Sequence, residues 1–522
     1  MKELKFEELS TRQKLGMTFT AVLHGGNRTD EDDAFVFDLI KNHSLGAVWV
    51  QQGFANTQEQ LAKVKEIADY PILIITDGES GVGEYLVGKH NAIGCTGSEK
   101  HAYAFGKAVG VTARKMGYNV VCDPVVDMCD GSQRSLGTDK HKVAALAVAE
   151  ARGMHDGGVL TVGKHYPGGS NTSEIDSHMA ESTSADTKQE LLDFSLYPYI
   201  KLNEEGLLDG IMSQHKRFYN IDPDHPATLS KSVLDIIREQ GYNGFIITDA
   251  LCMMGIRAKF GDVVSKGLAL SAGIDLLLPY TWNNTEQFSQ YCEAYEKGLV
   301  PDDMLDAAAK RILAAHHKVT LLPQDAELTK EDIKIFKSIN KDGVYTKVDD
   351  GLSHTISRDG KHYFVVIARQ ETDIAPSGKV DVDTFSNGWH FPARITQKIK
   401  ELFPNAGVKV IHQFPTQGEL ASVLSDSLGC DELVFMTFSE ALAYTGKEYL
   451  THRIVNLIDA MQVTGRISTI VHQGNPHVLE ELPHIPRYIF GGHAAESVDT
   501  CLEVLAGEYP ANGTPTYTFS LK

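Results

Sequence analysis

The sequence predicts an α/β protein with an N-terminal (β/α)8 TIM-type barrel followed by a C-terminal α/β sandwich domain. Short apolar runs alternate with longer amphipathic segments over the first part of the chain. A charged, weakly periodic stretch follows, and then a second set of alternating elements begins. Many strand and helix units in alternation are typical of a barrel, with a doubly wound open sheet as the structural alternative.

The predicted barrel covers residues 1–325, and its strands are brief apolar runs bounded by Gly, Pro, Asp or Asn. Continuous apolar runs of this kind favour parallel strands that are buried on both faces. They are Leu45–Val50, Pro71–Thr76, Val120–Val126, Leu160–Lys164, Leu208–Ser213, Phe245–Asp249 and Ile274–Pro279.

Helix signals lie between these runs. Ser230 is the predicted N-cap of SKSVLDIIREQG, which has an apolar face and ends at Gly241. A second helix, PDDMLDAAAKRILAAHHK, is predicted to begin with Pro301 in its first turn.

Residues 326–352 are predicted to be a linker with some helix, and residues 353–522 the sandwich domain. That domain is long enough to form a core of its own. Its predicted strands are YFVVIA, VKVIHQF, ELVFMTF, ISTIVHQG and RYIFGG.

Composition excludes several classes of function. The 522 residues carry 49 basic and 69 acidic side chains, which gives a net charge of −20. This balance argues against sequence-independent nucleic-acid binding and against an anionic membrane surface. No apolar run is long enough to span a membrane, and no signal peptide is expected. The seven cysteines are scattered, which predicts a reducing compartment, and we therefore expect a cytoplasmic protein.

Polar residues close most of the predicted barrel strands. Reacting groups of parallel barrels lie at this end, so together the residues predict a rim suited to sugars or phosphates. Each alone is more commonly a turn former or a cap. They are Asp77, Asp123, Asp127, Lys164, His165, Ser213, His215 and Asp249.

The richest motif is the stretch KHYPGGSNTSEIDSH, residues 164–178. Its end places Asp176 two positions before His178, and a carboxylate can orient a histidine and raise its basicity for acid–base work. The alternative is a surface loop in which the Asp-x-His spacing is incidental and has no function. A metal site made by His165, Asp176 and His178 is a third interpretation, but the spacing fits no common metal motif.

Asp249 follows the apolar run GFIIT. A carboxylate at a strand end suits a nucleophile that attacks an anomeric carbon. The alternative is an aspartate that caps the following helix.

These motifs resemble glycoside hydrolase family 3, and more narrowly its β-N-acetylglucosaminidase branch, over nearly the whole chain. The branch carries a Lys-His-Phe/Tyr-Pro-Gly loop that ends in Asp-Ser-His, matched here by residues 164–168 and 176–178. ITDALCM matches the nucleophile motif, ITDGESG a sugar-binding aspartate, and Arg134-Ser135-Leu136-Gly137 an Arg-Ser-Phe-Gly element. Where the branch has Pro-Gly-His-Gly, this chain has Pro167-Gly168-Gly169-Ser170, and its loop is one residue longer.

The resemblance implies a retaining exo-β-N-acetylglucosaminidase that uses neither a metal nor an organic cofactor and takes a small carbohydrate as its substrate. Neither nucleic acid nor a membrane is an expected partner. Asp249 would be the nucleophile and His178, oriented by Asp176, the acid/base. The residues implied in sugar binding are Asp77, Arg134, Lys164 and His165. The alternatives are another family 3 exo-β-glycosidase, such as a β-glucosidase or β-xylosidase, a glycoside phosphorylase, and a catalytically silent sugar-binding protein.

Overall fold

The computed structural model describes residues 2–23, 29–128, 133–170, 177–368, 371–374, 380–383, 391–440 and 448–522. The chain divides into two compact units. The first unit consists of Met1–Leu86, Ser98–Cys129 and Asp139–Phe336, and the second of Val87–Gly97, Asp130–Thr138 and Lys337–Lys522. Two short segments of the N-terminal half therefore belong to the second unit, and the boundaries 325 and 353 remain predictions.

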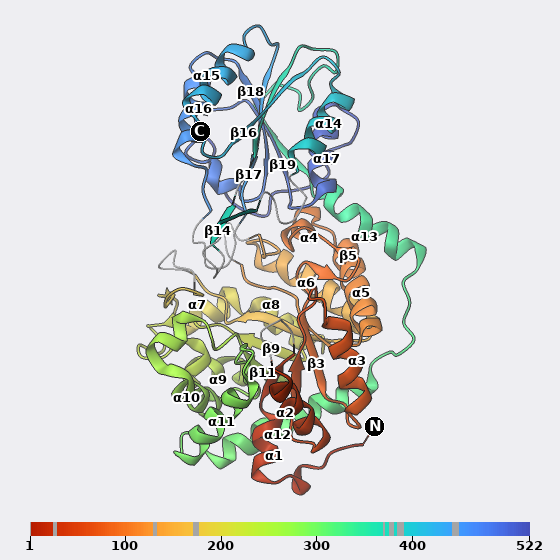
Figure 1. Cartoon of the computed structure of the whole chain (residues 1–522), viewed down its shortest axis with the longest axis vertical. Coiled ribbons are helices and arrows are strands. Elements are labelled where there is room, and N and C mark those ends of the chain that lie inside the picture. The colour runs from red at the N-terminus through yellow and green to blue at the C-terminus, as the bar shows by residue number, and fades with distance from the viewer. Residues whose placement is uncertain are drawn as a thin grey trace. The chain divides into compact units, whose positions relative to one another are not determined.

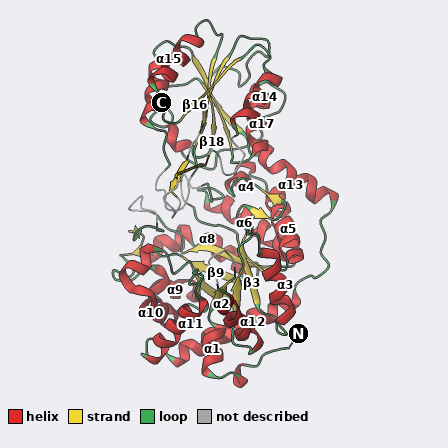
Figure 2. Cartoon of the chain, in the orientation of Figure 1, coloured by secondary structure: helices red, strands yellow, loops and turns green. Residues whose placement is uncertain are grey.

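The first unit is built on a curled parallel sheet (Figures 1 and 2). Isolated parallel bridges join Ile247 to Leu276 and Phe19 to Leu277, so residues 276–277 link the last strand to the chain just before the first. The predicted barrel class is confirmed. The strands, in spatial order, are β1 (Thr20–Val22), β2 (Ala47–Trp49), β3 (Leu73–Asp77), β6 (Val120–Cys122), β7 (Leu160–Tyr166), β9 (Gly210–Ser213) and β11 (Phe245–Thr248).

Alternate residues of these strands fill the interior of the barrel, as the two-residue period of a strand requires. The strand-end position of Asp77 and Asp249 is therefore set by runs of β-branched and leucine residues that anchor each strand. The interior cluster includes Trp49, Leu73, Ile75, Val120, Leu160, Val162, Met212, Phe245, Ile247 and Leu278.

Helices follow the strands. The larger ones are α1 (Thr11–Met17), α2 (Asp30–Lys41), α3 (Thr57–Ile67), α5 (Glu99–Met116), α6 (Lys140–Gly157), α8 (Tyr197–Glu204), α9 (Lys231–Glu239), α10 (Met254–Ala272), α11 (Asn284–Glu296) and α12 (Asp302–Leu321). Small elements are η1 (Phe6–Glu8), β4 (Gly81–Val82), β5 (Tyr85–Leu86), α4 (Asn91–Thr96), β8 (Thr183–Ser184), α7 (Lys188–Glu190), η2 (Leu191–Ser195), β10 (Arg217–Phe218) and η3 (Ala227–Leu229).

The two predicted helix starts had different outcomes. The side chain of Ser230 accepts the backbone N–H of Val233 at 3.3 Å, which confirms it as the N-cap of α9. Pro301 is not in the first turn of α12 but is its N-cap, since the helix begins at Asp302. Proline fits this place because the first N–H groups of a helix have no partner within it.

The second unit holds a six-stranded sheet of order β12-β19-β18-β17-β13-β16, parallel except for β12. One face packs against α14 and α17 and the other against α15 and α16 (Figure 1). The helix α13 (Lys330–Asp342) crosses the boundary between the units. The elements that follow it are β12 (Tyr345–Val348), β13 (Tyr363–Ala368), β14 (Glu371–Ile374), β15 (Val380–Asp383), α14 (Pro392–Leu402), β16 (Gly407–His412), α15 (Gln417–Asp426), β17 (Leu433–Phe438), α16 (His452–Gln462), β18 (Ile467–Gln473), η4 (Pro476–Leu479), β19 (Arg487–Gly491) and α17 (Ala495–Leu505).

The predicted α/β sandwich is thus confirmed, and each of its five predicted strands is present. The strand β12, which pairs antiparallel to β19, lies within the stretch predicted as a linker. Its sequence, YTKV, is too short and too polar to show a period.

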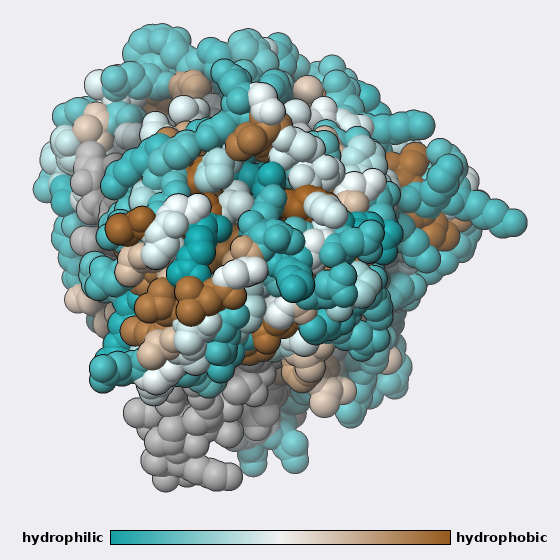
Figure 3. Space-filling model, turned by 90° about the horizontal axis from the view of Figure 1, so that it is seen from above, coloured by the Kyte–Doolittle hydropathy of each residue, from teal (hydrophilic) through white to brown (hydrophobic). Residues whose placement is uncertain are grey.

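Hydrophilic side chains cover most of the face seen in Figure 3, in keeping with the excess of acidic residues, and hydrophobic ones gather in smaller areas. Among the residues that the structure describes, no helix is long and apolar enough to cross a membrane.

Candidate active site

The carboxyl ends of the barrel strands carry the predicted site residues of the first unit. Asp77 is the last residue of β3, Lys164 and His165 lie near the end of β7, and Asp249 directly follows β11. Because parallel strands present their carboxyl ends at one rim of a barrel, these side chains share that rim. The structure therefore brings together four of the seven predicted site residues through their strands alone.

Lys164 forms the buried centre of a charge cluster. Its ammonium nitrogen lies 2.7 Å from Oδ1 of Asp77 and 3.6 Å from Oε2 of Glu79, and its side chain is only 1% exposed. A buried cation is tolerated where carboxylates compensate it. Both carboxylates remain partly exposed, so Lys164 holds them where they can accept hydrogen bonds.

Gln52 forms hydrogen bonds with the backbone of the turn that contains Asp77. Its amide nitrogen donates to the carbonyl oxygens of Asp77 and Gly81, at 3.2 and 2.9 Å. Its side-chain oxygen accepts the backbone N–H of Gly83 at 3.2 Å. One side chain therefore fixes the turn that follows β3 and, with it, the direction of Asp77.

His165 is oriented by Asp127. One carboxylate oxygen accepts the backbone N–H of His165 at 3.1 Å, and the other lies 2.7 Å from Nδ1. Nδ1 is therefore the protonated ring nitrogen, because a carboxylate only accepts at this geometry. Burial disfavours the charged form of Asp127, but the His165 ring and the Lys216 ammonium outweigh burial and hold the pKa of Asp127 below its ordinary value.

Asp249 is not a helix cap. Its backbone N–H donates to the carbonyl oxygen of Ser213 at 2.9 Å, which joins it to the end of β9. Its Oδ1 accepts the N–H of Ala250, and α10 begins only at Met254, whose N-cap is Met253. The capping alternative for Asp249 is therefore wrong for the helix that follows.

The segment that carries His178 is tied to the start of α10. The N–H of Met254 donates to the carbonyl oxygen of His178, and the N–H of Gly255 to that of Ser177, at 3.1 and 3.3 Å. A Cβ on Gly255 would lie 2.7 Å from the carbonyl oxygens of Ser177 and Ala180, so only glycine allows this approach. His178 is partly exposed beside the segment that follows Asp249.

His215 lies among these groups and is fully buried. Its Nε2 donates to the carbonyl oxygen of Ala250 at 3.0 Å, and Nδ1 lies 2.9 Å from Oγ1 of Thr228. Burial lowers the pKa of His215 against the opposing charge of Asp249, and the rings of His178 and His165 add to the lowering. His215 is therefore a neutral support that fixes the backbone next to Asp249.

Asp176, the predicted partner of His178, lies outside the described residues. Arg134 belongs to the second unit, where its carbonyl oxygen lies 3.2 Å from Nδ1 of His90.

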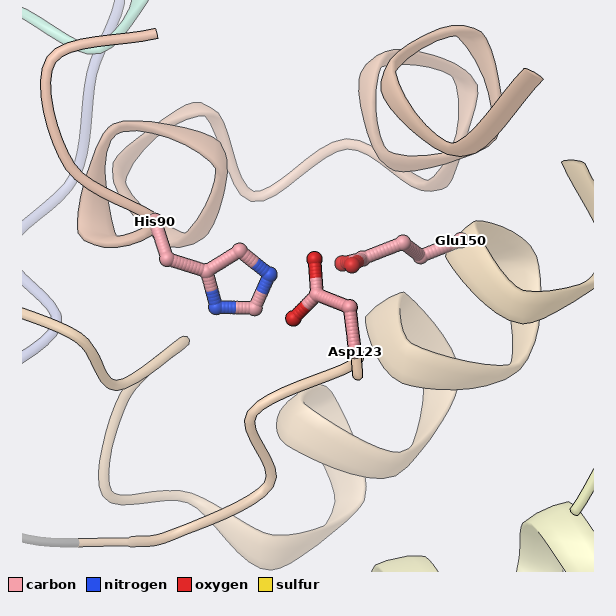
Figure 4. A group of neighbouring side chains, drawn as sticks. All are labelled: His90, Asp123 and Glu150. Atoms are coloured by element: carbon pink, nitrogen blue, oxygen red, sulfur yellow. The ribbon is translucent and has the colours of Figure 1, made fainter. Parts of the chain in front are cut away.

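Asp123, predicted for the polar rim, directly follows β6, but its side chain is fully buried. It points toward Glu150 of α6, which is also buried (Figure 4). His90, labelled in the same view, belongs to the second unit.

Sequence reasoning gave no role to Glu79, Gln52, Gln214 or Lys216. Gln214 and Lys216 lie just past β9, in the stretch IMSQHK, where Lys216 is only 5% exposed. A signal for them was available, because charged and amide side chains at the carboxyl end of a barrel strand are more often functional than those at its amino end.

The first unit thus carries carboxylates, a buried lysine and histidines at the carboxyl rim of a barrel, and the chain continues into an α/β domain. Residues 14–315 match the family described as "Glycosyl hydrolase family 3 N terminal domain", which covers more than half of the chain. The chain belongs to glycosyl hydrolase family 3.

Similar proteins support this assignment. A "Beta-hexosaminidase" of Idiomarina loihiensis is 30% identical over 253 residues, which are 45% of this chain and 75% of that protein. A "Beta-N-acetylglucosaminidase/beta-glucosidase" of Cellulomonas fimi is 25% identical over 344 residues, 60% of each chain. The solved structure of a glycoside hydrolase family 3 beta-N-acetylglucosaminidase from Paenibacillus has a TM-score of 0.79 and 22% identity, and the match covers 98% of this chain and 100% of that one.

Proposed function

We propose that this protein is a retaining exo-β-N-acetylglucosaminidase that removes terminal N-acetylglucosamine through a covalent glycosyl-enzyme. The proposal rests on the position of Asp249, which directly follows β11. The next helix, α10, binds the segment of His178 through two backbone hydrogen bonds. The names of the similar β-hexosaminidases support the choice of sugar. The scattered cysteines, free where described, support a cytoplasmic location as part of the same proposal.

Asp249 is the proposed nucleophile. In the first step one of its carboxylate oxygens bonds to the anomeric carbon while the bond to the leaving oxygen breaks. In the second step water attacks the same carbon and releases the carboxylate, so that two inversions give overall retention. Its backbone bond to Ser213 and the neutral His215 beside it support a fixed carboxylate at this place.

His178 is the proposed acid/base, with Asp176 as its proposed partner. The imidazolium gives its proton to the leaving oxygen, and the neutral ring then takes a proton from the attacking water. The backbone bonds of Ser177 and His178 to α10 support this role, because α10 follows the nucleophile closely in sequence. No metal or organic cofactor enters either step.

Asp77, Lys164, His165 and Arg134 are the proposed sugar-binding residues. A site with fixed donors and acceptors favours one epimer, because a mismatched hydroxyl leaves a buried polar group unpaired. The buried Lys164 and the two carboxylates beside it offer such fixed groups.

The Asp127–His165 pair favours a second candidate for the acid/base. This carboxylate–imidazole pair, with Nδ1 and Oδ2 2.7 Å apart, has the geometry that the sequence predicted for Asp176 and His178. Under this candidate His165 transfers the proton and His178 binds the sugar. Alanine variants of the two histidines distinguish the candidates.

A panel of nitrophenyl β-glycosides tests the function. We expect turnover of the N-acetyl-β-glucosaminide well above that of the β-glucoside and β-xyloside. A preference for either of the latter would reject the sugar assignment and leave the family assignment intact. Assays with and without inorganic phosphate separate hydrolysis, which gives the free sugar, from phosphorolysis, which gives a sugar 1-phosphate. The absence of any turnover would favour a silent sugar-binding protein.

A further inference from the structure

We propose that Lys216 is a positioning residue of the sugar site: it clamps the turn Gly168–Gly169 and, with Asp127, fixes His165. The inference rests on the proposed function only in placing a sugar at His165, and it holds for either role of that histidine.

Lys216 is buried and directed at the backbone of the turn. Its ammonium nitrogen donates to the carbonyl oxygens of Gly168 and Gly169, at 3.2 and 3.0 Å, and lies over the ring of Phe218. An ammonium removed from water at this depth requires strong acceptors, which these carbonyls provide. An apolar side chain of the same length would leave both carbonyl oxygens without this donor.

Gln214 reinforces the same turn from the same strand extension. Its amide nitrogen donates to the carbonyl oxygens of His165 and Gly168, at 3.1 and 2.6 Å. Lys216 and Gln214 together therefore hold the carbonyl oxygens of His165, Gly168 and Gly169. The turn that begins at His165 is fixed at both of its ends.

The glycine pair explains why a lysine is needed here. Gly168 and Gly169 have φ of +73° and +84°, which residues with a side chain rarely adopt. A Cβ on Gly169 would lie 2.6 Å from the ring of Phe218 and 2.9 Å from Oδ2 of Asp186. The turn can thus carry no side chain of its own at Gly169, and Lys216 and Gln214 support it instead.

Lys216 also acts on His165 through charge. Its ammonium group favours the ionised form of Asp127, and an ionised Asp127 accepts both the backbone N–H and the ring Nδ1–H of His165. The lysine thus supports His165 twice, through the backbone turn that follows it and through the carboxylate that orients its ring.

A double-mutant cycle tests the proposal. Lys216→Met should lower kcat/KM for the best nitrophenyl glycoside by roughly 10–100-fold, since a small displacement of a binding group has effects of this size. In a His165→Ala background, Lys216→Met should lower kcat/KM by less than about threefold, because the imidazole ring that Lys216 positions is already absent. Lys216→Arg, which restores a buried cation, should recover part of the activity. Equal losses in both backgrounds would overturn the proposal.

A second measurement does not depend on activity. The ¹⁵N shifts of the His165 ring, assigned with His165→Gln, report which ring nitrogen carries the proton. Wild type should show the proton on Nδ1, whereas Lys216→Met and Asp127→Asn should both shift the ring toward a mixture of tautomers. Lys231→Met, which removes an exposed lysine paired with Asp235, is the matched control and should change neither activity nor shifts. An unchanged His165 signal in Lys216→Met would overturn the proposal even if no glycoside is a substrate.

Discussion

The backbone N–H of Met254 donates to the carbonyl oxygen of His178 across 3.1 Å. Together with the bond from Gly255 to Ser177, it ties the segment of the proposed acid/base to the helix that follows the proposed nucleophile. Two motifs that are far apart in the sequence therefore depend on each other for their geometry.

Gly255→Ala tests this connection. The new Cβ would lie 2.7 Å from two carbonyl oxygens, so the segment of His178 must move. We expect kcat to fall by about tenfold or more, whereas the free energy of unfolding should fall by only about 1–3 kcal/mol. Gly418→Ala is the matched control, because Gly418 is also the second residue of a helix, α15, and a Cβ there would meet only Oγ1 of Thr416, at 4.0 Å. Normal kcat in Gly255→Ala would show that the connection does not position His178.

His178→Ala tests the acid/base assignment. Cleavage of a substrate with a poor leaving group should slow by ~10²–10⁴-fold, the usual contribution of general acid catalysis. An activated aryl leaving group should suffer less in the glycosylation step, because its oxygen needs little protonation. EDTA should change none of these rates.

The matched variant is His165→Ala. If the loss of activity in His165→Ala depends on the leaving group, and the loss in His178→Ala does not, then His165 is the acid/base and His178 binds the sugar. Comparable losses for good and poor leaving groups in both variants would reject both candidates.

Asp209 links stability to pH at the amino end of the barrel. It is buried before β9, where its carboxylate oxygens lie 2.6 Å from Nε2 of His155 and 3.0 Å from Nζ of Lys318. Burial disfavours its charge, but His155 and Lys318 outweigh burial and lower the pKa of Asp209. The folded state therefore binds fewer protons at this residue than the unfolded state, and its contribution to stability is lost as the pH falls.

Asp209→Asn should lower the free energy of unfolding at pH 7 by roughly 1.5–3 kcal/mol, the value of a hydrogen bond to a charged group. The difference from wild type should shrink as the pH falls below the ordinary aspartate pKa of about 3.9, where the unfolded chain takes up its proton. Denaturant unfolding of both proteins at pH 7, 5 and 3.5 measures this difference in the free energy of unfolding. A constant difference over this range would contradict the linkage. The kcat of the folded variant at pH 7 should be unchanged.

Much of the fold follows from local sequence signals. Ser230 caps α9 because the N-cap bond lies within one turn of chain, and the strand YFVVIA is visible from composition alone. The strands β1 and β12 were not predicted, because three or four residues are too few to show a period. The last predicted barrel strand, Ile274–Pro279, is present only as isolated bridges at Leu276 and Leu277.

Site residues that close an apolar run could be predicted from the sequence. Contacts between residues of different strands could not. Asp77 and Asp249 could be placed because each ends an apolar run. The pairing of Lys164 with Glu79, and that of His165 with Asp127, joins different strands whose contacts only the fold decides. For the same reason the burial of Asp123 was not foreseen, since a strand-end position alone does not say which way a side chain points.

Covalent trapping tests the central claim, that Asp249 is the nucleophile of a retaining glycosidase. A 5-fluoro N-acetyl-β-glucosaminide should accumulate one sugar per active site, and peptide mapping should place it on Asp249 within GFIITDALCMM. Asp249→Ala should take up no label and lose hydrolysis almost completely, and added azide should restore cleavage of an activated substrate with formation of the α-glycosyl azide. A label on another carboxylate, or an inverted product from the unmodified enzyme, would contradict the account.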